Sequence, residues 1–202
     1  MGFQVTTTDG ICHLVMDHPP VNALTVAGWF ELADLLTAAG RDPEVGVVIL
    51  SAAGKGFNAG VDIKEMQNTE GFDALIGANR GCAAAFGAIY DCEVPVICVV
   101  HDFVLGGGIG LMGNSDIVVA AEGTTIGLPE VKRGLFAAGG GTALATRIPL
   151  AIALELTLTG DLIDAGRAAA LGLVNQVVPP DEVLDTALAL AGRVAATSDR
   201  RA

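Results

Sequence analysis

The sequence predicts an α/β fold with a mostly parallel sheet, and two observations carry the prediction. Short segments at residues 45–50, 96–100 and 117–120 are apolar at almost every position, which is typical of parallel strands covered on both faces. Between them lie segments with the apolar spacing of amphipathic helices. Strands that alternate with helices favour the α/β class. We expect the 202 residues to form a single domain.

The first quarter of the chain predicts a hairpin followed by a helix. Residues 3–9 and 11–17 are expected to be strands, because the Asp9-Gly10 dipeptide between them is a strong hairpin signal. Thr25 is a suitable N-cap for a helix that runs to about Ala39. The apolar residues of that helix share one face, which comprises Trp29, Leu32, Leu35 and Leu36.

The rest of the chain continues the alternation. After the strand at 45–50, a helix is expected to begin at Asp62, and an alanine-rich helix is expected at 72–91. A glycine-rich helix from Gly106 separates the strands at 96–100 and 117–120. The remaining expected elements are a short strand at 124–128, a turn or single helical turn at 129–133, helices at 139–147, 150–158 and 164–171 (stopped by Gly172), a strand at 174–178 and a last helix from Pro180 to about Ala196.

Composition excludes several functional classes. Apolar residues make up 51% of the chain and charged residues 17%, which excludes intrinsic disorder. The net charge is −12, so we expect no nucleic-acid partner, since such proteins present a basic face. We expect no membrane partner either, because no apolar run approaches the ~18 residues of a membrane helix. The four cysteines lack metal-ligand spacing, which predicts no metal site and reduced thiols in the cytoplasm.

Two glycine-rich junctions are candidates for binding developing negative charge. Gly106, Gly107 and Gly108 lie where a strand passes into a helix, and the segment 54–62 forms a second junction of this kind. Glycines at a helix start leave backbone N–H groups uncovered, and the helix dipole favours an anion there. Two such donors can form an oxyanion hole. The alternative is that these glycines only allow close packing of helix and strand.

Residues 108–113 also spell G-x-G-x-x-G, the fingerprint of a dinucleotide site. That fingerprint requires an acidic residue about 20 positions further on, at the end of the next strand. Glu122 comes too early to leave room for a helix and a strand, and Glu130 falls in a turn. Nucleotide binding is therefore the weaker interpretation.

A search for catalytic side chains leaves one candidate. None of the three serines lies in G-x-S-x-G. His13 alternates with apolar neighbours in a strand, and Asp116 begins an apolar strand, so both are expected to be structural. Glu130 remains, after an apolar strand and before a glycine-rich helix. It is either a catalytic carboxylate or a carboxylate that stabilises a helix N-terminus, and local sequence does not decide between them.

The motifs taken together resemble the crotonase superfamily, the enoyl-CoA hydratase/isomerase family. Order and spacing match from about residue 3 to residue 196, through residues 20–24 (PVNAL), 56–66 (GFNAGVDIKEM), 104–108 (VLGGG), 116–117 (DI) and 127–130 (GLPE). The resemblance implies a spiral of ββα units, an acyl-CoA substrate without a prosthetic group, and a homo-oligomer, trimer or hexamer. The family adds C-terminal helices over the acyl pocket, so we expect that cover to be incomplete from about residue 180.

The resemblance also assigns roles to residues. It implies that the Val61 and Gly107 N–H groups hold the thioester oxygen and that Glu130 is catalytic. The positions implied to contact substrate or coenzyme A are Asn22, Ala23, Leu24, Ala59, Gly60, Asp62, Ile63, Gly106, Pro129 and Gly134.

Two positions depart from the family pattern. Hydratases carry a second glutamate where this chain has Gly110, and an acid used by dienoyl isomerases falls at Ala138.

One actinobacterial branch, a crotonase paralogue of steroid catabolism, also has glycine at the position of Gly110. It is similar at residues 57–62, 69–72, 78–82 and 113–116. The resemblance implies hydrolytic C–C opening of a cyclic β-diketone on coenzyme A, or enoyl-CoA double-bond isomerisation. Simple hydration and a catalytically silent CoA-binding subunit stay open.

Overall fold

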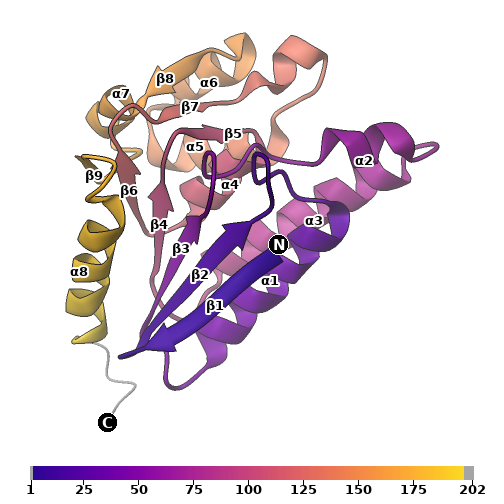
Figure 1. The fold of residues 1–202 in the computed structure, drawn as a ribbon. Coiled ribbons are helices and arrows are strands. Elements are labelled where there is room, and N and C mark those ends of the chain that lie inside the picture. Colours follow the sequence, from indigo (N-terminus) through magenta and orange to yellow (C-terminus); the bar gives the residue numbers. More distant parts are fainter. Residues whose placement is uncertain (1, 198–202) are drawn as a thin grey trace.

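The computed structural model describes residues 2–197 and contains a central sheet of six strands (Figure 1). Their order is β1 (Gly2–Thr8), β2 (Ile11–Asp17), β3 (Val47–Ala52), β4 (Val96–Val100), β6 (Ile117–Ala121) and β9 (Gln176–Val178). The β1–β2 hairpin is antiparallel, and every other neighbouring pair is parallel. The predicted α/β class and parallel sheet are confirmed.

A second sheet of three short strands lies beyond the carboxyl ends of β3 and β4 (Figure 1). It consists of β5 (Phe103–Leu105), β7 (Thr125–Gly127) and β8 (Leu162–Asp164). Strand β5 pairs with β7 in parallel, and β8 pairs with β7 antiparallel. This sheet brings the start of the glycine-rich helix and the segment of Glu130 to one end of the molecule.

Helices cover both faces of the central sheet (Figure 1). The helices are α1 (Val26–Arg41), α2 (Ile63–Asn68), α3 (Asp73–Tyr90), α4 (Gly107–Asn114), the 3₁₀ helix η1 (Pro129–Arg133), α5 (Ala138–Arg147), α6 (Leu150–Thr159), α7 (Ala165–Ala170) and α8 (Val183–Ala195). The described helices include none that is long and apolar enough to cross a membrane.

The alternation of side chains along each strand divides the core between the two faces. Leu14 and Leu50 belong to the large core that also contains Trp29 of α1. Ile49 points to the other face, where Ala187 of α8 packs. Strands buried on both faces read as continuous apolar runs, which is why residues 45–50, 96–100 and 117–120 were recognisable as strands.

Local signals placed most helix starts, with one correction. The Gly28 N–H donates to Thr25 Oγ1 at 3.1 Å, so the predicted N-cap is confirmed. The Lys64 N–H donates to Asp62 Oδ1 at 2.8 Å, so Asp62 is the N-cap of the helix that was expected to begin there. The prediction that Pro180 opens the last helix was wrong. The Glu182 N–H donates to the Pro179 carbonyl at 2.9 Å, and this extra turn delays the start of α8 to Val183.

Candidate active site

Backbone pairing holds the two glycine-rich junctions side by side. The Leu105 N–H donates to the Asn58 carbonyl and the Phe57 N–H to the Phe103 carbonyl, both at 2.9 Å. Residues 57–58 therefore extend the second sheet next to β5, although they are almost fifty positions earlier in the chain. Consequently the segment that carries Val61 runs directly past the N-terminus of α4.

Two buried asparagines fix the first of these segments. The Gly60 N–H donates to Asn58 Oδ1 at 2.8 Å, and Asn58 Nδ2 donates to the Asn22 carbonyl. Asn22 Nδ2 in turn donates to the carbonyls of Ala53 (2.8 Å) and Gly56 (2.9 Å), while Asn22 Oδ1 accepts the His18 N–H. Both hydrogens of the Asn22 amide are thus in use inside the protein, and its side chain positions the loop.

The N–H groups of Val61 and Gly107 are free to bind an oxygen atom. The Leu24 N–H donates to the Gly60 carbonyl and the Asp62 N–H to the Leu24 carbonyl, each at 2.9 Å. Successive N–H groups of an extended backbone point to opposite sides, so the Val61 N–H points away from Leu24. Within residues 2–197 neither the Val61 nor the Gly107 N–H has an acceptor.

These two donors lie close together at a helix start. A Cβ atom added to Gly60 would lie 3.1 Å from the Gly107 nitrogen, so the space beside Gly60 opens directly onto the second donor. Gly106 precedes α4 with φ 55° and ψ −120°, a conformation that side chains disfavour. The arrangement can stabilise an oxyanion through two N–H groups and the helix dipole.

Glu130 reaches the same end of α4 from η1. Pro129 occupies the first position of η1, and a Cβ atom added to Gly106 would lie 3.1 Å from Glu130 Oε1. Glu130 Oε2 is buried and has no hydrogen-bond partner among the described residues. Burial raises the pKa of Glu130, with a smaller opposing contribution from its own backbone N–H. A carboxylate with a raised pKa and an unpaired oxygen is a stronger base than an ordinary glutamate and is suited to taking up and returning a proton.

The helix α3 supplies two residues near α4 and Glu130 that sequence reasoning missed, Cys82 and Phe86. Burial, and after it the charge of Glu130, raises the pKa of the Cys82 thiol to about 12, so this thiol stays protonated. Phe86 follows one turn later and packs edge-on against Trp29, with ring centroids 5.8 Å apart. Trp29 Nε1 is buried without a partner among the described residues. The four-residue spacing of Cys82 and Phe86 was the available signal, but it indicated only a buried helix face.

The remaining predicted contact positions differ in their exposure. Ala59 is half-buried and Leu24 is fully buried, Ile63 is 42% exposed at the start of α2, and Ala23 is half-buried. Gly134 closes η1 in the left-handed conformation, with φ 72°.

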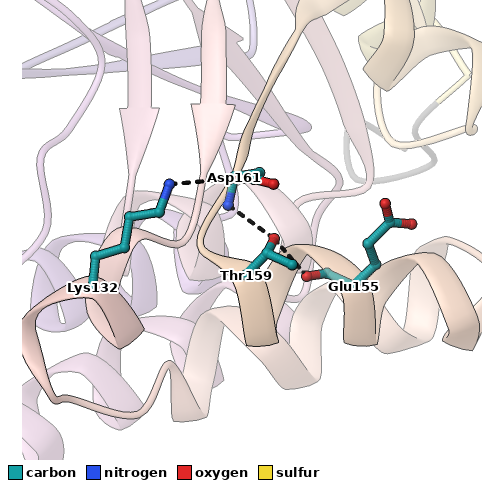
Figure 2. A network of polar contacts seen from close by, with 4 residues as sticks. All are labelled: Lys132, Glu155, Thr159 and Asp161. Carbon is teal, nitrogen blue, oxygen red and sulfur yellow. Dashed lines mark hydrogen bonds and ion pairs between the residues drawn. The ribbon is translucent and has the colours of Figure 1, made fainter.

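An exposed polar network anchors η1 from outside (Figure 2). Lys132 Nζ lies 3.1 Å from Asp161 Oδ1, and the Asp161 N–H donates to Thr159 Oγ1 at 3.1 Å. Thr159 Oγ1 donates to the Glu155 carbonyl at 2.8 Å. The network joins the element that carries Glu130 to the end of α6.

His13 and Asp116 are structural, as expected. His13 Nε2 lies 2.8 Å from Ser51 Oγ between neighbouring strands. Asp116 Oδ2 accepts the Val96 N–H at 2.7 Å and so fixes the start of β4.

Comparison with known proteins agrees with this geometry. Residues 6–201 match the family model described as enoyl-CoA hydratase/isomerase. The chain is 51% identical over 201 residues to a (7aS)-7a-methyl-1,5-dioxo-2,3,5,6,7,7a-hexahydro-1H-indene-carboxyl-CoA hydrolase of Rhodococcus jostii, covering 99% of this chain and 77% of that protein. It is also 51% identical over 197 residues to the Mycobacterium tuberculosis protein of the same name, covering 98% of this chain and 79% of that protein.

Solved structures give the same result for the fold. Human enoyl coenzyme A hydratase domain-containing protein 3 superposes with a TM-score of 0.93 at 31% identity, over 100% of this chain and 79% of that one. An enoyl-CoA hydratase of Mycobacterium smegmatis gives 0.91 at 30% identity, over 96% and 76%. The chain therefore belongs to the enoyl-CoA hydratase/isomerase family, the crotonase superfamily of enzymes.

Proposed function

We propose that this protein is an acyl-CoA hydrolase that opens a carbon ring of its substrate by adding water across a C–C bond. The single observation that carries the proposal is Glu130: a half-buried carboxylate with a raised pKa and an unpartnered oxygen, beside the free N–H of Gly107. The names of the two relatives at 51% identity support the substrate class.

The substrate named for those relatives is suited to such a cleavage. Its ketone at position 1 adjoins the quaternary carbon 7a, which is joined through the remaining ring alkene to the ketone at position 5. When water adds to the ketone at position 1 and its bond to carbon 7a breaks, the electron pair spreads through the alkene to the second ketone. Where the thioester is conjugated with that alkene, the pair also reaches the thioester oxygen.

Glu130 and the two backbone N–H groups have separate tasks in this reaction. Glu130 takes a proton from water as the water oxygen bonds to the ketone carbon. The C–C bond then breaks, leaving a carboxylic acid on one side and an enolate on the other. The N–H groups of Val61 and Gly107 hold the enolate oxygen, an interaction that contributes roughly 3–4 kcal/mol per donor in such sites. Glu130 returns the proton to carbon.

The proposed reaction is redox-neutral and balances with water alone, so it needs no prosthetic group, and coenzyme A enters as part of the substrate. Asn22, Ala23, Leu24, Ala59, Asp62, Ile63, Pro129 and Gly134 are proposed to line the coenzyme A and acyl site. The thiols of Cys12, Cys82 and Cys98, which form no disulfide among the described residues, support a cytoplasmic location.

A homo-oligomer, trimer or hexamer, is part of the proposal. Helix α6 supports it, because Leu150 (61% exposed), Leu154 (48%) and Leu158 (64%) recur at one-turn intervals on an unburied face. Exposed apolar rows of this kind mark association surfaces.

Mass spectrometry of the product separates the alternatives. The purified enzyme is incubated with the indene-carboxyl-CoA thioester, and ring opening predicts a CoA-linked product that is heavier by one water and carries a new carboxylic acid, with no free thiol released. Methyl esterification marks that acid by a further increase in mass, whereas hydration of the ring alkene would add one water but no acid. Free coenzyme A would show thioester hydrolysis instead. Rapid hydration of crotonyl-CoA, or an isomerised product of unchanged mass, would favour the hydratase or isomerase alternative. Binding of the thioester without turnover would favour a silent subunit.

A further inference from the structure

We infer that Phe86 is the specificity-determining residue of this site: its ring takes the volume that any side chain at position 110 or 139 would need, and so leaves Glu130 as the working carboxylate. The inference rests on the Glu130-centred site proposed above and extends it to the choice of acyl group.

The two glycines that face the ring come from different helices. A Cβ atom added to Gly110 of α4 would lie 2.2 Å from Phe86 Cζ and 2.5 Å from both Cε atoms. A Cβ atom added to Gly139 of α5 would lie 2.4 Å from Phe86 Cε2 and 3.0 Å from Cδ2. Real Cβ atoms do not approach so closely. The Phe86 ring therefore fits against α4 and α5 only because positions 110 and 139 are glycines. Position 138 also lies at this end of α5, but its side chain is outside the described part of the chain.

The ring has little freedom to retreat. Trp29 packs against it at an interplanar angle of 83° and is itself fully buried. Trp29 is confined in turn, because a Cβ atom on Gly81 would lie 2.7 Å from Trp29 Cβ and one on Gly107 would lie 2.9 Å from Trp29 Cζ2. The two aromatic rings therefore form a continuous wall, which runs from the Gly107 donor to α5.

This wall borders the space in which Glu130 acts. Its Trp29 end lies against Gly107, and a Cβ atom added to the preceding residue, Gly106, would lie 3.1 Å from Glu130 Oε1. Phe86 is only half-buried, so its ring presents apolar surface to this space, and such a surface beside a single carboxylate suits a rigid fused-ring acyl group that packs against it. It is unsuited to a water molecule held between two carboxylates, the arrangement that hydration of a short enoyl chain favours.

The test compares four chains: wild type, Phe86→Ala, Gly110→Glu and the double variant. We expect Gly110→Glu to lower the melting temperature by several degrees, the usual consequence of overpacking a core, and to gain no hydration of crotonyl-CoA. The double variant should recover most of the lost melting temperature, and it should hydrate crotonyl-CoA at least tenfold faster than wild type. Gly192→Glu on α8 is the matched control, because a Cβ atom there meets nothing within 4 Å, and it should melt like wild type.

Two results would overturn the inference: Gly110→Glu melting like wild type, or a folded double variant that hydrates crotonyl-CoA no faster than Gly110→Glu. If Phe86→Ala does not fold, Phe86→Leu takes its place in the cycle under the same criteria. If wild type does not open the indene ring but Phe86→Ala still rescues Gly110→Glu, the proposed substrate is wrong and the role of Phe86 stands. If wild type opens the ring but Phe86→Ala does not rescue Gly110→Glu, the proposed function stands and the role of Phe86 is wrong.

Discussion

At the scale of single residues, Glu130 is held in an environment that favours its neutral form. Burial raises its pKa above the ordinary value, which is about 4.3 for a glutamate in water. The folded state therefore binds this proton more tightly than the unfolded state does. The resulting stabilisation is complete below the unfolded pKa and is lost as the pH rises through the folded pKa.

Glu130→Gln should therefore stabilise the protein at neutral pH and have almost no effect at pH 4. Above its raised pKa the wild-type carboxylate is charged in a buried position, whereas the amide carries no charge at either pH. Denaturant unfolding at the two pH values measures the difference in free energy. Glu155→Gln on the exposed face of α6 is the control and should show no such dependence. An equal effect of Glu130→Gln at both pH values would contradict the buried-carboxylate account.

At the scale of elements, the site depends on two strand-to-helix junctions being pressed together. The glycine pattern predicted both junctions, because uncovered N–H groups at a helix start are a local property of the chain. It did not predict β5 or β8, each of which has only three residues and forms through pairing with β7. Nor did it predict Phe86 against Gly110, because that contact joins α3 to α4 and leaves no local pattern.

Gly60→Ala tests the junction directly. The new methyl group would lie 3.1 Å from the Gly107 nitrogen and would enter the space proposed for the thioester oxygen. We expect kcat/KM to fall about 10²-fold or more, the loss typical of one oxyanion donor.

Gly54→Ala is the matched control for that substitution. Gly54 has φ +72° and Gly60 has φ +90°, so both variants carry backbone strain, but a Cβ atom on Gly54 meets nothing within 4 Å. The control should lose stability and keep its activity. Similar kcat/KM values for the two variants would show that the space beside Gly107 is not used by substrate.

At the scale of the whole molecule, the parallel sheet and its two apolar faces were predictable, since buried strands and amphipathic helices leave strong periodic signals. The homo-oligomer was expected only from resemblance and remains a proposal. The surface proposed for it is the leucine row of α6, which is exposed in the isolated chain.

Leu154→Glu combined with Leu158→Glu should reduce the molecular mass measured by sedimentation velocity from that of an oligomer to that of one chain. The two charges would have to be buried without partners if this face associates. Tyr90→Glu, at a side chain that is 75% exposed on α3, is the control and should leave the mass unchanged. A double variant that sediments like the wild-type oligomer would place the association surface elsewhere.

The central claim is that Glu130 is the carboxylate that moves the proton, and single-turnover kinetics of Glu130→Gln on the indene-carboxyl-CoA thioester test it most directly. General acid–base groups contribute ~10²–10⁴-fold, so the rate should fall by that factor while the Kd for the thioester changes little. The wild-type rate should also rise with pH through the raised pKa of Glu130, and the variant should lose that dependence. A folded Glu130→Gln enzyme that turns over its substrate at nearly the wild-type rate would contradict the account.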